Sequence, residues 1–295
     1  MLPFKLLTTL WLLYFMFHES GFHTNRPLHD LTIRSWTTDD GLISNSTTGV
    51  IQTPDGYIWI SSFNGVSRFD GQRFTLFSTR NSTAFKTNAV ISMHVDEAGI
   101  LWLATQGSGV LKYSGDFAKI PNVPNSTRIV RSLGEEVWVG TNEKGLFRII
   151  ENDAEPLFQN EIQGTVNAIT FDTEGNIWIG TDADGLFRVN NERIVDHLRI
   201  EDGLSTNSIY SLDWADNKLF VGTANGLFLL ENGILTEVPE LSGMGVNYIN
   251  ADAENAAWFA TESGLFRMDS GDGEIDSFSE ENGLPGRQIS SLWFD

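Results

Sequence analysis

Few side chains in this sequence are of the kinds that catalyse reactions or bind metals, and none has the spacing of a catalytic motif. The histidines number five, at His18, His23, His29, His94 and His197. No two of them form an HxH or HExxH spacing, and no serine lies in a GxSxG nucleophile elbow. His94 and His197 end apolar segments, a place typical of a hydrogen-bonded structural histidine. The sequence therefore predicts no catalytic residue, no cofactor and no metal centre.

One acidic loop has side chains that could hold a cation. Residues 269–274 read DSGDGE, and closely spaced oxygen ligands are what a calcium site uses. The loop lacks the twelve-residue pattern and the terminal glutamate of a calcium-binding loop. A polar turn between two strands explains these residues as well as calcium binding does.

The composition excludes several classes of partner and chemistry. The 295 residues include 39 acidic and 19 basic side chains, which give a formal net charge of −20. An acidic surface disfavours nucleic acid and anionic lipid as partners. Cysteine is absent from the sequence, which excludes disulfides, thiolate metal sites and thiol catalysis.

The elements that must position any binding group come from one repeated unit. Residues 176–189 read NIWIGTDADGLFRV, which predicts a strand, a tight turn and a returning strand. The unit recurs about every 40 residues, as in repeat proteins. Its aromatic position is occupied by Trp59, Trp102, Trp138, Trp178, Phe220 and Trp258. Its turn glycine is Gly65, Gly109, Gly145, Gly185, Gly226 or Gly264.

The repeat predicts an all-β fold, a β-propeller of four-stranded blades. An alternating apolar segment precedes each hairpin and a more polar segment follows it, so each unit has four short strands. The six complete blades are expected at about residues 47–78, 88–120, 127–158, 165–198, 207–238 and 245–278. Both faces of the Trp strand are apolar, so we interpret the Trp series as packing between blades rather than as a ligand platform.

The two ends of the sequence depart from the repeat. Residues 1–20 have Lys5 before an apolar run, which indicates a signal peptide or an N-terminal anchor ahead of a propeller at 28–295. Residues 287–295 resemble a first strand, and residues 31–36 an outermost strand, of a seventh blade without its Trp hairpin. We therefore expect an incomplete, truncated propeller of marginal stability, with unpaired backbone at the missing strands.

Several phrases together resemble the two-component regulator propeller repeat. They are TTDDGLISN at 37–45, TPDGYIWISSFNGVSRFDGQRF at 53–74, DTEGNIWIGTDADGLFRV at 172–189 and DGLSTNSIYSLD at 202–213. The resemblance implies the extracytoplasmic sensor of a membrane protein whose cytoplasmic end is a histidine kinase, hybrid kinase or diguanylate cyclase. It implies a periplasmic location, with or without an inner-membrane anchor, and allows a homodimer. The output domain would lie outside this sequence.

The function expected from these observations is sensing by a non-enzymatic propeller. The ligand would be a small molecule, with carbohydrates as candidates by analogy with the family, and the partner a membrane signalling protein or missing C-terminal domains. No ligand-binding residue is predicted. A lyase or glycosidase is one alternative, but it would need carboxylates or histidines converging from several blades, and no repeat unit departs from the others in that way. A protein-interaction scaffold is the other.

Overall fold

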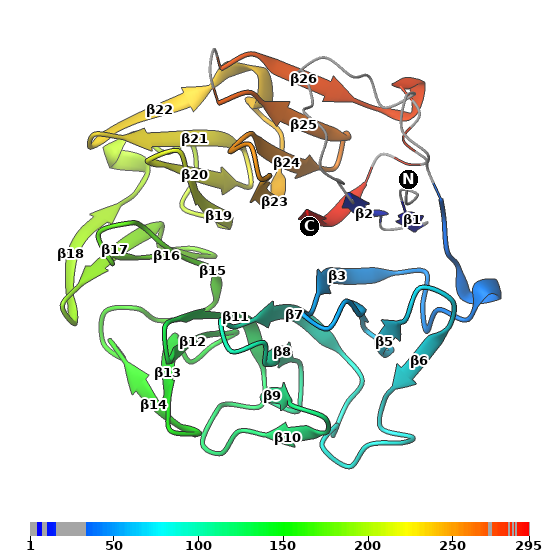
Figure 1. Cartoon of the computed structure of the whole chain (residues 1–295). Helices are drawn as coiled ribbons and strands as arrows, with labels where there is room; N and C mark the ends of the chain where they lie inside the picture. The colour runs from blue at the N-terminus through cyan, green and yellow to red at the C-terminus, as the bar shows by residue number, and fades with distance from the viewer. Residues whose placement is uncertain are drawn as a thin grey trace.

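The strands of this protein are arranged as blades around one axis (Figure 1). The computed structural model describes residues 5–7, 11–15, 34–270, 273–282, 284, 286 and 288–294. Six sheets each have four consecutive antiparallel strands, and a seventh sheet has three strands. The predicted fold, an all-β propeller with six complete blades and part of a seventh, is confirmed.

Each blade runs from an innermost first strand to an outermost fourth strand. Blades one and two comprise β3 (Thr47–Gln52), β4 (Ile58–Ser62), β5 (Gly65–Phe69), β6 (Phe74–Phe77), β7 (Val90–Val95), β8 (Leu101–Thr105), β9 (Val110–Tyr113) and β10 (Phe117–Lys119). Blades three and four comprise β11 (Thr127–Leu133), β12 (Glu136–Thr141), β13 (Leu146–Ile150), β14 (Asp153–Leu157), β15 (Val166–Phe171), β16 (Ile177–Thr181), β17 (Leu186–Asn190) and β18 (Arg193–Leu198). Blades five and six comprise β19 (Ile209–Ala215), β20 (Lys218–Thr223), β21 (Gly226–Glu231), β22 (Ile234–Val238), β23 (Val246–Ala251), β24 (Ala257–Thr261), β25 (Leu265–Met268) and β26 (Ile275–Phe278).

The first strands close a ring around the axis. Each contacts the first strand of the next blade, and β27 (Ile289–Phe294) contacts both β23 and β3. Figure 1 shows these seven strands around the centre. The ring therefore has seven positions, although six blades are complete.

The core of the protein lies between blades rather than in one central mass. Trp178 of blade four, for example, packs in one cluster with Ile209 and Leu212 of blade five. The small residue two places after the aromatic allows this contact, because a Cβ on Gly180 would lie 2.5 Å from Ile209 Cγ2. The indole N–H groups of Trp59, Trp102, Trp178 and Trp258 are also hydrogen-bonded, whereas that of Trp138 has no hydrogen-bond partner among the described residues. Trp178 Nε1 donates to Asp172 Oδ2 at 3.0 Å, and the same carboxylate accepts the Asn176 amide of the preceding turn.

Short 3-10 turns of similar sequence precede three of the first strands, β3, β19 and β27. They are η2 (Thr38–Asp40), η3 (Ile200–Asp202) and η5 (Glu280–Asn282). A buried leucine follows each of them, at Leu42, Leu204 and Leu284, and each is 3% exposed. Leu204 packs between Trp178 of blade four and Leu212 of blade five. The leucine thus fills the space between neighbouring blades.

The seventh position differs from the sequence-based expectation. Strands β1 (Lys5–Leu7) and β2 (Trp11–Phe15) form a hairpin whose β2 pairs in parallel with β27. The expected unpaired backbone beside β27 is therefore occupied, since an edge strand is a template for any available segment. This pairing is parallel, whereas the second strand of every complete blade is antiparallel to the first.

The other end of the expected seventh blade is only partly within the described residues. Residues 31–33 lie outside them, and residues 34–36 belong to no named strand. Trp36 instead packs edge-on against Phe69 of blade one, with ring centroids 5.4 Å apart. The described residues include no helix with the length and apolar character of a membrane span.

Candidate functional site

One position of the repeat carries a different side chain in every blade. It is the fifth residue of each first strand, which lies opposite the aromatic of the second strand in the six complete blades. We call these residues the axial ring: Ile51, His94, Arg131, Thr170, Asp213, Asn250 and Trp293. All except Ile51 are partly exposed, although the strands on either side of them are largely buried.

The axial ring divides into a polar arc and an apolar arc. His94, Arg131, Thr170, Asp213 and Asn250 come from blades two to six in order, and we call them the polar arc. Trp293 of β27 and Ile51 of blade one complete the ring as the apolar arc. A ring with one polar and one apolar side is the composition typical of a small-molecule site.

The opposite end of the first strands carries side chains that tie the blades together. The pairing register skips the second residue of the first strand in all six complete blades, as at a β-bulge. Thr48 Oγ1 in this position donates to Val90 O of the next blade at 2.6 Å. Asn167 Nδ2 donates to Ile209 O at 2.9 Å, and Arg128 Nε donates to Asn167 Oδ1 at 3.1 Å. These polar groups are occupied in holding the ring closed.

Arg131 and His94 are the neighbouring basic residues of the polar arc, and only Arg131 is charged at neutral pH. Burial and the positive charge of Arg131 lower the pKa of His94 to about 3. The neutral imidazole forms a hydrogen bond between Nε2 and Ser132 Oγ at 2.7 Å. His94 is therefore a polar but uncharged neighbour of the guanidinium.

Asp213 interacts electrostatically with Arg131, which lies two blades away. Burial raises the pKa of Asp213 to about 6, against the opposing effects of the Ala251 and Trp214 amides and of the Arg131 charge. Its Oδ2 accepts from Ala251 N and its Oδ1 from Trp214 N, both at 3.0 Å. Blade four lies between the blades of β11 and β19, so Arg131 and Asp213 interact without sharing a blade interface.

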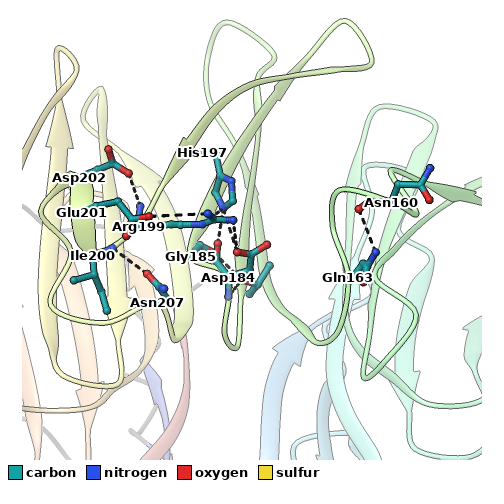
Figure 2. A network of polar contacts seen from close by, with 11 residues as sticks. Asn160, Gln163, Asp184, Gly185, His197, Arg199, Ile200, Glu201, Asp202 and Asn207 are labelled. Atoms are coloured by element: carbon teal, nitrogen blue, oxygen red, sulfur yellow. Dashed lines mark hydrogen bonds and ion pairs between the residues drawn. The ribbon is translucent and has the colours of Figure 1, made fainter.

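A second polar cluster lies on the connection between blades four and five. Arg199 Nη2 forms an ion pair with Asp184 Oδ1 at 2.5 Å, and His197 Nε2 lies 2.6 Å from Asp184 O (Figure 2). The His197 ring stacks on Phe187 with centroids 3.8 Å apart. The Arg199 amide donates to Asp202 Oδ2 and caps η3. Because these groups hold one another, the cluster fixes a connector and offers little to a ligand.

The repeat positions singled out in the sequence lie in the blade interfaces and are not members of the axial ring, although each aromatic pairs with a ring residue across two strands. The six aromatics are all buried, with exposed fractions from 1% at Trp59 to 6% at Trp258. The turn glycines have positive φ, as at Gly185 with 79°, where a Cβ would lie 2.2 Å from Leu198 O. These residues build the scaffold that carries the ring.

The sequence analysis did not single out the axial ring. In ring order, Arg131 lies between His94 and Asp213. The signal was present in the repeat itself, because these residues occupy one equivalent position. It is visible only when the first strands are aligned from their buried starting residue, such as Val90, Thr127 and Ile209.

The acidic loop at 269–274 is only partly described, because residues 271 and 272 lie outside the described residues. Within the described part of the chain, no group of three or more histidine, aspartate or glutamate side chains is placed to hold a metal ion. Ca²⁺ takes six to eight oxygen ligands.

Comparison with known proteins supports the resemblance found in the sequence. Residues 160–183, which cover the first and second strands of blade four, match the family model described as two component regulator propeller. A search of curated proteins found no match.

Solved propellers share the fold at low sequence identity. The extracellular domain of the hybrid two component system BT3049 from B. thetaiotaomicron has a TM-score of 0.73 and 19% identity, over 84% of this chain and 36% of that chain. The corresponding domain of BT4673 has a TM-score of 0.71 and 18% identity, over 85% of this chain and 38% of that chain. The WD40 β-propeller domain of Doa1 has a TM-score of 0.67 and 12% identity, over 83% of this chain and 85% of that chain. This chain thus spans little more than a third of the two-component domains that it resembles.

Proposed function

We propose that this chain is a ligand-binding propeller of an extracytoplasmic two-component sensor, and that its ligand binds at the axial ring. The observation that carries the proposal is the chemistry of one repeat position, where His94, Arg131 and Asp213 of three different blades interact electrostatically. Scaffold positions repeat the same residue type from blade to blade, whereas the axial ring carries seven different side chains. Packing between blades does not require charged and polar side chains at this position, so their gathering in one ring supports recognition of a ligand.

The comparisons support the sensor part of the proposal. The similar solved domains are extracellular domains of two-component systems, and one repeat matches the regulator-propeller family. We propose that occupancy of the ring is passed to a membrane signalling partner or an output domain outside this chain. A homodimer would give that partner two equivalent inputs.

Binding is favoured over catalysis by the charges available. Glycoside hydrolysis uses two carboxyl groups that flank the scissile bond. Among the described first strands, Asp213 is the only acidic residue. A single carboxylate with a raised pKa suits hydrogen bonding to a ligand better than it suits this chemistry.

A thermal-shift screen of the chain against oligosaccharides and metabolites tests the proposal. A ligand at one hundred times its dissociation constant stabilises the folded state by about 2.7 kcal/mol, which is measurable as a rise in Tm. We expect at least one compound to raise the Tm of the wild type and to lose this effect in Asn250→Ala, which truncates the ring on β23.

Asn247→Ala is the matched control, because it removes the same side chain from the same strand at the bulge. It should keep the full shift. Equal shifts in both variants would place binding away from the axial ring. A complete absence of shifts across the screen would count against a small-molecule sensor and favour a protein-interaction scaffold.

A further inference from the structure

We propose that the polar arc binds a small hydroxylated carboxylate, with Arg131 holding the carboxylate and Asp213 and Thr170 holding hydroxyl groups. This inference rests on the proposed function, because it assumes a ligand at the axial ring. It adds the charge and chemical class of that ligand.

The first strands have the opposite charge balance from the rest of the molecule. The chain carries 39 acidic and 19 basic side chains. The seven described first strands contain Arg128, Arg131 and neutral His94, but Asp213 as their only acid. A basic centre inside an acidic protein draws an anion toward the axis, since field lines concentrate where one sign of charge is enclosed.

Arg131 has the donors that an anion needs. Its Nη1 donates to Val130 O at 2.9 Å, and it forms no ion pair with any of the described acidic residues. A guanidinium has five N–H donors in a planar fork that matches a carboxylate in two parallel hydrogen bonds. Its closest basic neighbour on the ring, His94, is neutral and does not compete for the anion.

The neighbours of Arg131 along the arc suit hydroxyl groups. Each Asp213 oxygen accepts one backbone amide and keeps a second lone pair for a further donor. Thr170 lies between Arg131 and Asp213 in ring order, and its side chain is partly exposed. Direct contact between Arg131 and Asp213 is absent from the ion pairs of the described residues, so a ligand can take hydrogen bonds from one and give them to the other.

The apolar arc opposes this polar side. Trp293 and Ile51 are adjacent across the closure of the ring, and Trp293 packs on the cluster that contains Val50 and Ile58 of blade one. The carbon skeleton of a sugar acid or related hydroxy acid has apolar C–H faces that contact such a surface. An aromatic beside polar groups is the usual pairing in sites of this kind.

Isothermal titration of the full chain with gluconate and with glucitol tests the inference. The two probes share their hydroxyl groups and differ by a carboxylate against a hydroxymethyl group. We expect gluconate to bind with a Kd below ~10 mM and glucitol to bind at least about tenfold more weakly. Arg131→Gln should reduce gluconate affinity at least about tenfold. Arg131→Lys keeps the charge but loses the planar fork of N–H donors, so its affinity should lie between those of the wild type and Arg131→Gln.

Arg128→Gln is the control, because it removes the same charge from the same strand at the bulge end, and it should reduce gluconate affinity much less than Arg131→Gln because Arg128 is not a member of the axial ring. Melting curves of all three variants show whether each is folded. Equal affinity for gluconate and glucitol would overturn the anionic class while leaving the sensor function intact. Gluconate binding unchanged in Arg131→Gln, or absent in the wild type, would also overturn the inference. The wider thermal-shift screen judges the sensor function separately.

Discussion

At the scale of single residues, the axial ring combines groups whose charge states are set by burial. Asp213 has a pKa raised to about 6, and His94 has a pKa lowered to about 3, because each is enclosed where its charged form is poorly solvated. Both shifts leave the neutral form more populated than in water. At neutral pH the ring therefore carries the Arg131 charge and a carboxylate that is held in the charged form at a cost to folding.

Asp213→Asn should change how the stability of the protein depends on pH. The folded pKa of Asp213 lies above the unfolded value of about 3.9, so its contribution to stability is present at low pH and is lost as pH rises through about 6. Asparagine does not titrate. We expect the stability of Asp213→Asn relative to wild type to improve by ~2 kcal/mol between pH 4.5 and pH 7.5.

Urea unfolding of both proteins at the two pH values measures this difference. Asp213→Asn also loses one acceptor for the Trp214 or Ala251 amide. This loss lowers the unfolding free energy by the same amount at each pH, so it cancels from the difference between the two pH values. His94 titrates alike in both proteins and cancels too. Parallel pH profiles would show that Asp213 is not held in a poorly solvated place.

At the scale of elements, each blade is a sheet that cannot bury its second face without the next blade. The residue two places after the aromatic decides how closely the blades approach. A Cβ on Gly180 would lie 2.5 Å from Ile209 Cγ2 and 2.9 Å from Ile209 Cβ, and a Cβ on Gly222 would lie 2.8 Å from Val246 O. The second strand of one blade thus touches the first strand of the next at a point where a side chain has no space.

Gly180→Val should be far more destabilising than a change at nearby Asp182. Overpacking typically costs about 1 to 3 kcal/mol. We expect Gly180→Val to lose ~3 kcal/mol of unfolding free energy, because the valine would contact Ile209 Cβ, which is fixed to the backbone of the next blade. Asp182→Asn, at an exposed neighbouring position, should stay within about 0.5 kcal/mol of the wild type. Equilibrium unfolding in urea measures both.

The double variant Gly180→Val with Ile209→Ala identifies the contact responsible. Removing the Ile209 methyl groups opens the space that valine needs. The double variant should therefore lose less unfolding free energy than the sum of the losses in the two single variants. Strict additivity, or single variants of equal stability at Gly180 and Asp182, would contradict close blade packing at this residue.

At the scale of the whole molecule, ring closure depends on β27. This strand contacts β23 on one side and β3 on the other, so the seven first strands close although six blades are complete. Strand β2 from the N-terminal segment pairs with its outer edge. The same segment is the one whose composition predicts a signal peptide or anchor, so two uses compete for residues 11–15.

A fusion of residues 1–35 to a reporter that is active only in the periplasm distinguishes these uses. We expect the reporter to be active, because Lys5 followed by an apolar run fits a signal sequence. Replacing Leu12 and Leu13 by arginine should abolish activity without affecting expression, since charge interrupts the apolar run. An expressed but inactive wild-type fusion would favour β2 as a structural strand and count against an extracytoplasmic sensor.

The sequence by itself determined the blade, because the interactions that define a blade are local. A blade is defined by its alternating apolar residues, its Trp position and turn glycines such as Gly185. These features lie within about 40 residues of one another, and the same pattern recurs in each repeat. Repetition therefore predicted the all-β propeller and the number of complete blades. The axial ring could not be read in this way. Its members are each about one repeat apart, and whether Arg131 acts on Asp213 two blades away depends on how the ring closes. The partner of β27 likewise follows from which segment reaches a free strand edge. Both are set by contacts between parts of the chain that are distant in sequence, which only the tertiary structure brings together.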